Sequence, residues 1–248
     1  GMGLVTGPNG SGKKTTAYSV VNMLNTISVN ICTVEDPIEY GIHRVNQIQV
    51  NPATGLTFAA GLRALLRHDP NIIMVGEIRD TETAEMAIHA SLTGHLVLST
   101  LHTNSAIGAI PRLLDMGVEA FLLSSTLNAI MGQRLVRRLC PSCIYRVKDD
   151  PTALEIFSKF RPEITKVTSF RGKGCHECSQ TGFRGRICVY EILEIDSYIR
   201  QLINQKASAD EILEYSRKHG MTTMIEDGLD KVTAGLTTVE EVLRVVKE

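Results

Sequence analysis

The stretch that decides the fold is Leu4–Tyr18, which reads LVTGPNGSGKKTTAY. It runs from a short buried strand through a glycine-rich loop into a helix expected over residues 14–24. Glycines let a backbone wrap closely around phosphates, and the N–H groups at a helix start favour an anion. The stretch therefore predicts a nucleotide site, and its strand–loop–helix order disfavours a chance turn. The expected loop contacts are Gly7, Pro8, Asn9, Gly10, Ser11, Gly12, Lys13, Lys14 and Thr15.

Position 14 departs from the phosphate-loop pattern. Ser or Thr is expected after Lys13, because its hydroxyl ligates Mg²⁺, but the chain has Lys14. Thr15 comes one residue later, and one step along a helix turns a side chain by about 100°, away from the metal. An ammonium repels a cation, although it can supply positive charge beside phosphates. The sequence thus predicts nucleotide binding and leaves the efficiency of Mg²⁺-dependent hydrolysis open.

Composition excludes several classes of protein. The chain of 248 residues is 43% hydrophobic and 21% charged, as in an ordinary globular protein. A net charge of −1 gives no general attraction to nucleic acid. No apolar stretch approaches the ~20 residues that span a bilayer, so no membrane span is expected. The chain begins almost directly on its first strand, which favours a piece of a longer protein.

Acidic residues follow two further predicted strands. A β-branched run is followed by Glu35, Asp36 and Glu39, and the apolar run Ile72–Val75 is followed by Glu77. The carboxyl ends of parallel strands are where α/β sheets bind ligands. An apolar strand that ends in an acid is the Walker B arrangement, whose carboxylate meets Mg²⁺ or the attacking water. For the first cluster, a solvated turn begun by Asp-Pro is an equal alternative.

Basic side chains offer further candidates. His102 follows a buried strand over 96–100, where it can sense a γ-phosphate, although a lone histidine is more often structural. Arg63 and Arg67 share one face of a helix expected over 58–67 and could clamp a phosphate; a solvated or salt-bridged pair is the alternative.

The other segments are expected to be mainly helical. Residues 40–57 predict a hairpin or an extended excursion, and residues 81–93 a helix. The pattern over 106–139 is helical, and so is the tail over 196–248.

Two C-x-x-C pairs predict a metal site. Together they supply four thiolates for a tetrahedral, structural Zn²⁺, with free thiols or a redox pair as alternatives. Residues 144–174 separate the pairs, which predicts an inserted subdomain with a helix near Pro151–Phe160. The expected ligands are Cys140, Cys143, Cys175 and Cys178.

With these motifs in place, the chain resembles the secretion traffic ATPases of type II secretion and type IV pilus assembly. The resemblance covers essentially the whole chain, as the C-terminal motor domain. GPNGSGK is similar to the Walker A loop of that family, TVEDPIEY to its acidic box and MVGEIRD to its Walker B segment. TGHLVLSTLHTNSA resembles its histidine box, and CPSC with CHECSQTGFRGR its tetracysteine element. Lys14, Asn9 and Ser105 depart from the family pattern.

The resemblance implies an α/β fold: a RecA-like P-loop NTPase core with a zinc-knuckle insert and a C-terminal helical subdomain. The implied divisions are 1–139, 140–188 and 189–248. Lys13 and the loop amides would hold the phosphates, His102 would contact the γ-phosphate region, and either Glu35 or Glu77 would polarise water. The residues implied for catalysis are Glu77, Glu35, Glu39, His102, Arg63, Arg67 and Arg79, the arginines lying near the nucleotide or a subunit boundary.

The function implied is ATP binding and hydrolysis that powers secretion or pilus assembly, with ATP, Mg²⁺ and structural Zn²⁺. The family resemblance also implies a homo-hexamer on the cytoplasmic side of the inner membrane, docked onto membrane proteins of the machine. The zinc knuckles favour its secretion and assembly branch over its retraction branch. Because of Lys14, the alternative is a nucleotide-binding, hydrolytically impaired structural or regulatory subunit. A zinc-stabilised adaptor that binds no nucleotide is a third possibility.

Overall fold

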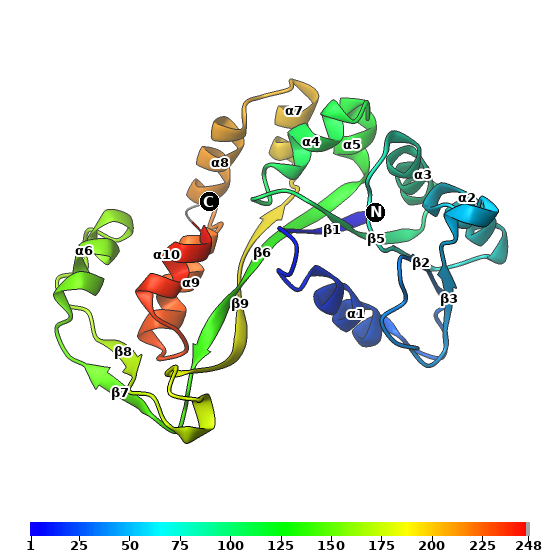
Figure 1. The fold of residues 1–248 in the computed structure, drawn as a ribbon. Coiled ribbons are helices and arrows are strands. Elements are labelled where there is room, and N and C mark those ends of the chain that lie inside the picture. The colour runs from blue at the N-terminus through cyan, green and yellow to red at the C-terminus, as the bar shows by residue number, and fades with distance from the viewer. Residues whose placement is uncertain (247–248) are drawn as a thin grey trace. The chain divides into compact units, whose positions relative to one another are not determined.

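The computed structural model describes residues 1–246, and its fold is mixed α/β with a mostly parallel sheet (Figure 1). The chain forms two compact units. Gly1–Gly132 and Ile192–Met221 make the first, and Gln133–Glu191 with the stretch from Thr222 make the second. The chain passes between the units three times: within the long strands β6 (Leu127–Leu139) and β9 (Phe183–Glu194), and between Met221 and Thr222. The three-part division expected from the sequence stays a prediction.

The strands of the seven-stranded sheet follow the order β3-β2-β4-β5-β1-β6-β9. Pairing is parallel from β3 through to β6. Thr6 lies opposite Leu101, and Val75 lies opposite both Val34 and Ser99, so these strands end at one edge. The bounds of the first five strands are β1 Met2–Thr6, β2 Ile31–Glu35, β3 Val45–Gln49, β4 Ile72–Val75 and β5 Leu96–Leu101.

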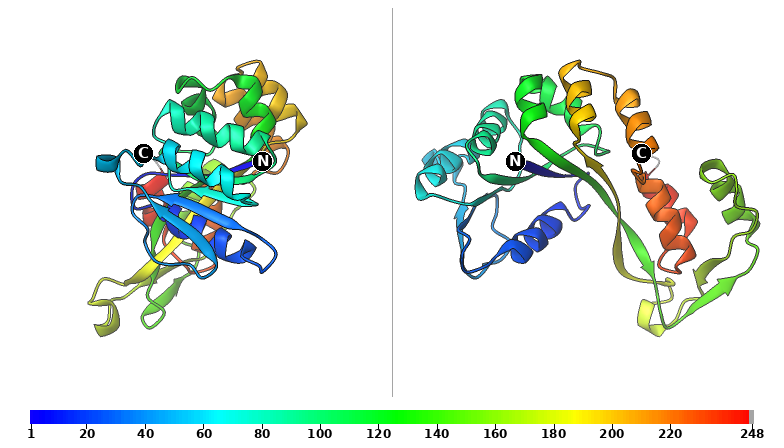
Figure 2. Two further views of the ribbon diagram at one scale, coloured as in Figure 1. Left: turned by 90° about the vertical axis from the view of Figure 1, so that its right-hand side faces the viewer. Right: turned by 180° about the vertical axis from the view of Figure 1, so that it is seen from behind.

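The strands β2 and β4 are buried on both faces, which explains their continuous apolar runs. Successive side chains of β4 point to opposite faces: Ile72 and Met74 pack with α1 (Lys13–Leu24), whereas Ile73 and Val75 belong to the larger core on the other face. Figures 1 and 2 show α1 on the opposite side of the sheet from α2 and α3. The helices that contribute to the larger core are α2 Phe58–Leu65, α3 Thr81–Leu92, α4 Ala109–Asp115, α5 Ala120–Thr126, α7 Ser197–Asn204 and α8 Ala209–Lys218.

Of the two alternatives for residues 40–57, the extended one holds, because β3 is an extended strand that pairs with β2 in parallel. One expectation about secondary structure was wrong. The helical pattern expected over 106–139 ends at Thr126, and β6 follows it. The hydroxyls of Ser124, Ser125 and Thr126 bond back to carbonyls of α5, which weakens continuation of the helix. The residues after them then gain β1 as a pairing partner.

The second unit has its own small core. β7 (Ile144–Val147) and β8 (Ser169–Gly172) form an antiparallel pair, and the predicted helix of the insert is α6 (Pro151–Phe160). Its apolar side chains pack with those of α9 (Met224–Thr233) and α10 (Val239–Val246). None of the helices within residues 1–246 is both long and apolar enough to cross a bilayer.

Candidate functional site

The predicted phosphate loop joins β1 to α1, as the sequence indicates. Gly10 and Gly12 take φ values of 75° and 87°, which are accessible to glycine at little cost. Lys13 is 8% exposed, and its Nζ donates hydrogen bonds to the carbonyls of Gly7 (2.7 Å) and Pro8 (3.0 Å). Burial lowers the pKa of Lys13, and the nearby charge of Glu77 opposes that shift. A cation therefore lies inside a turn at the positive end of a helix.

A cavity of about 340 Å³ lies beside this loop. Its volume is in the range of small-ligand sites. Its walls come from the loop, from the start of α1 and from the carboxyl ends of β2, β4 and β5. The lining residues are Asn9, Gly10, Ser11, Gly12, Lys13, Lys14, Thr15, Asp36, Gly76, Glu77, Arg79, Thr100 and His102.

Glu77 is the central acid of the cavity. Its side chain is 8% exposed, and its Oε2 lies 2.6 Å from Nε of Arg79 and 3.3 Å from Nε2 of His102. The hydrogen bond to Glu77 is the main cause that raises the pKa of Arg79. The preceding Gly76 is fixed, because its N–H donates to Val34 (2.7 Å) and its carbonyl accepts from Thr100 Oγ1 (2.7 Å). Thus the predicted Walker B acid, the predicted histidine and one predicted arginine lie together.

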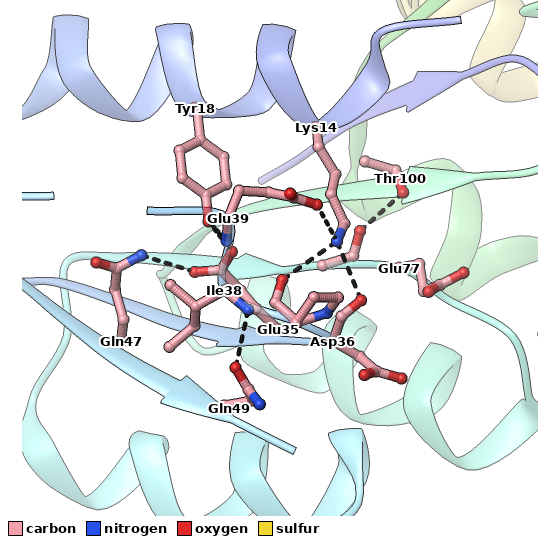
Figure 3. Close-up of polar contacts among 12 residues, drawn as sticks. Lys14, Tyr18, Glu35, Asp36, Ile38, Glu39, Gln47, Gln49, Glu77 and Thr100 are labelled. Carbon is pink, nitrogen blue, oxygen red and sulfur yellow. Dashed lines mark hydrogen bonds and ion pairs between the residues drawn. The ribbon is translucent and has the colours of Figure 1, made fainter. Parts of the chain in front are cut away.

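Lys14 points toward the end of β2 (Figure 3). Its Nζ donates to the carbonyls of Asp36 (3.0 Å) and Pro37 (3.2 Å) and to Oε1 of Glu39 (2.8 Å). An ammonium has three N–H donors, so these contacts use all of them. The positive charge that replaces the expected hydroxyl is therefore directed to protein acceptors.

Glu35 is buried on the α1 side of β2 and does not line the cavity within the described chain. It accepts hydrogen bonds from Tyr18 Oη, from Thr33 Oγ1 (2.5 Å) and from Gln47 Nε2 (3.0 Å). Asp36, the first residue after this strand, is among the residues that line the cavity. Glu39 is held by Lys14 and is likewise absent from the cavity lining described above.

The predicted arginine pair lies outside the cavity lining within residues 1–246. Arg63 pairs with Glu82 at 3.1 Å, and both side chains are exposed. Arg67 lies in the short turn Leu66–His68. Their expected place at a subunit boundary stays a prediction.

Sequence reasoning missed two residues at this site. Asp36 belongs to the acidic cluster after β2, but the sequence does not distinguish it from its neighbours, and Thr100 at the end of β5 is not among the predicted site residues. Their position at strand ends was the available signal.

The four predicted zinc ligands converge in the second unit. All four Sγ atoms lie within 4.8 Å of one another, with Cys140–Cys175 and Cys143–Cys178 at 3.8 Å and Cys175–Cys178 at 3.7 Å. Four sulfurs tetrahedrally placed about 2.3 Å from Zn²⁺ lie about 3.8 Å apart, whereas disulfide sulfurs lie about 2.05 Å apart. The residues therefore fit a closed, four-thiolate zinc site.

One ligand is already biased toward the thiolate form. Burial acts against ionisation of Cys178, but N–H groups of Cys175 (3.2 Å) and Gly182 (3.3 Å) point at its sulfur and lower its pKa to about 6.

The fold and the loop define a P-loop α/β protein. Comparison with protein families then makes the assignment: the model described as "Type II/IV secretion system protein" matches residues 1–244, and the chain belongs to that family.

Individual relatives agree with this assignment. The chain is 54% identical over 250 residues to type II secretion system protein E of Pseudomonas aeruginosa, covering 100% of this chain and 49% of the relative. It is 51% identical over 243 residues to the type IV pilus assembly ATPase PilB of Thermus thermophilus, covering 98% of this chain and 27% of PilB. The structure of the pilus retraction motor PilT with bound ADP has a TM-score of 0.74 and 33% identity, covering 100% of this chain and 62% of PilT. The chain thus spans at most about half the length of these two curated relatives.

Proposed function

We propose that this chain binds ATP at the cavity beside Lys13 and hydrolyses it as the motor part of a secretion or pilus-assembly machine. One observation carries the proposal: Lys13, Glu77, Arg79 and His102 line a single cavity at the carboxyl edge of a parallel sheet. In phosphoryl transfer the protein mainly positions the reactants and stabilises charge. This cavity offers both, through a glycine-rich turn and closely placed cations and carboxylates.

Each group has a distinct role in the proposed reaction. Triphosphate oxygens would replace the loop carbonyls as partners of Lys13. The N–H groups at the start of α1 would donate hydrogen bonds to the same phosphate oxygens. Glu77 would accept a hydrogen bond from the attacking water and orient it toward the γ-phosphate. Arg79 and His102, which already contact Glu77, would hold that carboxylate and face the developing negative charge.

The cavity offers some of the ligands that a divalent cation needs. Carboxylates of Asp36 and Glu77 line the cavity, but position 14 offers an ammonium in place of a hydroxyl. Mg²⁺ in nucleotide sites is commonly held by one or two carboxylates together with phosphates. In the proposed site Asp36 and Glu77 would hold Mg²⁺, which would supply positive charge beside the phosphates.

The biological setting follows from the relatives. Protein E of type II secretion and PilB of type IV pilus assembly are the matched proteins, so the proposed work is secretion or pilus assembly. We also propose that the chain works as part of a homo-hexamer at the cytoplasmic face of the inner membrane. This hexamer would dock on membrane proteins of the machine. Nucleic acid is not a proposed partner.

Lys13→Ala tests the proposed site. Because Lys13 is the cation inside the loop, the variant should lose binding of a fluorescent ATP analogue, whereas Lys206→Ala, outside the cavity, should keep it. Equal affinity of the wild type and Lys13→Ala would contradict the proposed site.

Lys14 supports a second candidate, a nucleotide-binding subunit with impaired hydrolysis. The observation is that its ammonium lies where a metal-ligating hydroxyl is expected and bonds the segment after β2. Single-turnover hydrolysis by the wild type and by Lys14→Thr separates the two candidates. If Lys14→Thr is much faster, the impaired subunit is supported. A wild type that already turns over at the rate of the variant favours the working motor.

A further inference from the structure

The segment Glu35–Glu39, called here the acidic segment, is attached to one face of α1. Lys14 and Tyr18 are four residues apart, so their side chains project from the same face of the helix. Lys14 holds two carbonyls and one carboxylate of the segment, as described above. Tyr18 contacts it at two more points: its hydroxyl donates to Glu35 and accepts the N–H of Glu39 at 3.1 Å. Figure 3 shows both side chains directed at the segment.

The side chain of Tyr18 is held in place by the residues around it. The side chain is 1% exposed, and its ring lies 4.7 Å from that of Tyr40. Burial and the hydrogen bond to Glu35 raise the pKa of Tyr18 to about 12, so the hydroxyl stays a donor at neutral pH. Glu35 is also bonded from β2 by Thr33 and from β3 by Gln47. The carboxylate therefore joins α1 to two strands.

Lys14 makes a weak ion pair with Glu39 and also fixes the position of the neighbouring backbone. Lys14 and Glu39 are 31% and 49% exposed, and an exposed ion pair alone contributes little. The two carbonyl acceptors matter more for position, because they belong to Asp36 and Pro37 themselves. Asp36 is the residue of the segment that reaches the nucleotide cavity. Fixing its carbonyl fixes the backbone from which its carboxylate projects.

We propose that Lys14 and Tyr18 are positioning residues that tie the acidic segment to α1 and so hold Asp36 at the cavity. Since α1 begins at the phosphate loop, the loop and the acidic segment then move as one body. In this chain the residue expected to ligate a metal serves this attachment instead. The effect on turnover rests on the proposed ATPase function, but the attachment itself does not.

The test uses Lys14→Met, Tyr18→Phe, the double variant and the control Ser19→Ala, which removes an exposed hydroxyl from the same helix. Amide hydrogen exchange is measured by mass spectrometry on peptides covering residues 36–44, without nucleotide. Exchange at Glu39 should rise about five- to tenfold in Tyr18→Phe, as expected for one lost hydrogen bond, and further in the double variant. Ser19→Ala should match the wild type. Unchanged exchange in the double variant would overturn the proposal.

Kinetics add a readout that a general loss of stability would not give. With Mg-ATP, Tyr18→Phe should lower kcat about tenfold or more, because Asp36 is displaced, and should leave the dissociation constant of an ATP analogue nearly unchanged. Weaker nucleotide binding with unchanged kcat would contradict the positioning role. A wild type without turnover would count against the ATPase function, while the exchange result would still decide the attachment.

Discussion

Glu77 meets a guanidinium and an imidazole through the same oxygen, Oε2. A carboxylate held in this way has one preferred orientation, which a water-orienting group needs. Glu35 is held by three hydrogen bonds of its own, but it is not among the residues that line the cavity within residues 1–246. The two acids between which the sequence left the choice open thus differ in access to the cavity. Geometry favours Glu77 as the acid that faces the water.

Glu77→Gln should lower kcat for ATP by about a hundredfold or more, because an amide is a far weaker base, while ATP affinity changes little. Steady-state turnover and equilibrium binding of an ATP analogue measure the two effects. Glu82→Gln, an exposed acid paired with Arg63, is the matched control and should keep wild-type kcat. A Glu77→Gln protein as fast as this control would rule out the assigned role.

Much of this site could be predicted from residues alone. The loop, Glu77 and His102 stand at strand ends, and parallel strands bring such ends together. The choice between Glu35 and Asp36 could not be predicted. It depends on where β2 ends, because Glu35 is its last residue and Asp36 the first one after it. A strand that is buried throughout also shows no polar–apolar alternation from which its faces could be assigned.

Elements follow the sequence less closely than the site does. The apolar runs of β2, β4 and β5 and the helices α1 to α3 come out where the periodicity places them. β6 does not, because its apolar residues recur at mixed spacings and its strand form depends on pairing with β1 and β9. Sequence-distant pairing of this kind leaves no local signal.

α10 depends on one buried acid. Glu241 is 3% exposed and accepts hydrogen bonds from the backbone N–H (3.0 Å) and the guanidinium (2.6 Å) of Arg137, and from Arg244 (2.9 Å). Burial acts to raise the pKa of Glu241, but these hydrogen bonds outweigh it and lower the pKa to about 2. The ionised carboxylate therefore stabilises the folded state.

Glu241→Gln should lower the free energy of unfolding by about 1–3 kcal/mol at neutral pH, measured by denaturant titration. Glu240→Gln, at the exposed neighbouring position, should change it little. The wild type should lose the Glu241 contribution as pH falls from its unfolded pKa, about 4.5, toward about 2, and Glu241→Gln should lack this component. Parallel acid-unfolding curves for the two proteins would contradict this assignment.

At the scale of the whole molecule, the two units draw stability from different sources. The first unit buries both faces of a sheet against helices. In the second, the cysteine pairs lie next to a two-stranded sheet too small to be stable by itself. Because a structural Zn²⁺ contributes folding free energy directly, we expect the cysteine region to depend on metal.

Chelation of zinc should unfold residues 140–178 and leave the phosphate loop folded. Hydrogen exchange should accelerate in peptides that contain the cysteines and stay unchanged over residues 7–24, and added Zn²⁺ should restore protection. Protein purified without chelators should contain stoichiometric zinc by metal analysis. Metal-free protein with a protected cysteine region would show that the thiols stabilise this region without an ion.

The placement of β1 has a consequence for synthesis on the ribosome. Of the strands described here, β1 is made before the others, yet both its neighbours, β5 and β6, are encoded far downstream. In a nascent chain that does not yet include β6, one edge of β1 is unpaired. The strand that carries the phosphate loop is then not yet fixed in the sheet. Contacts this distant in sequence form slowly, and their edges stay exposed in the meantime. Emerging polypeptide is thus most vulnerable to misassociation, and most in need of chaperones, until translation has passed residue 132.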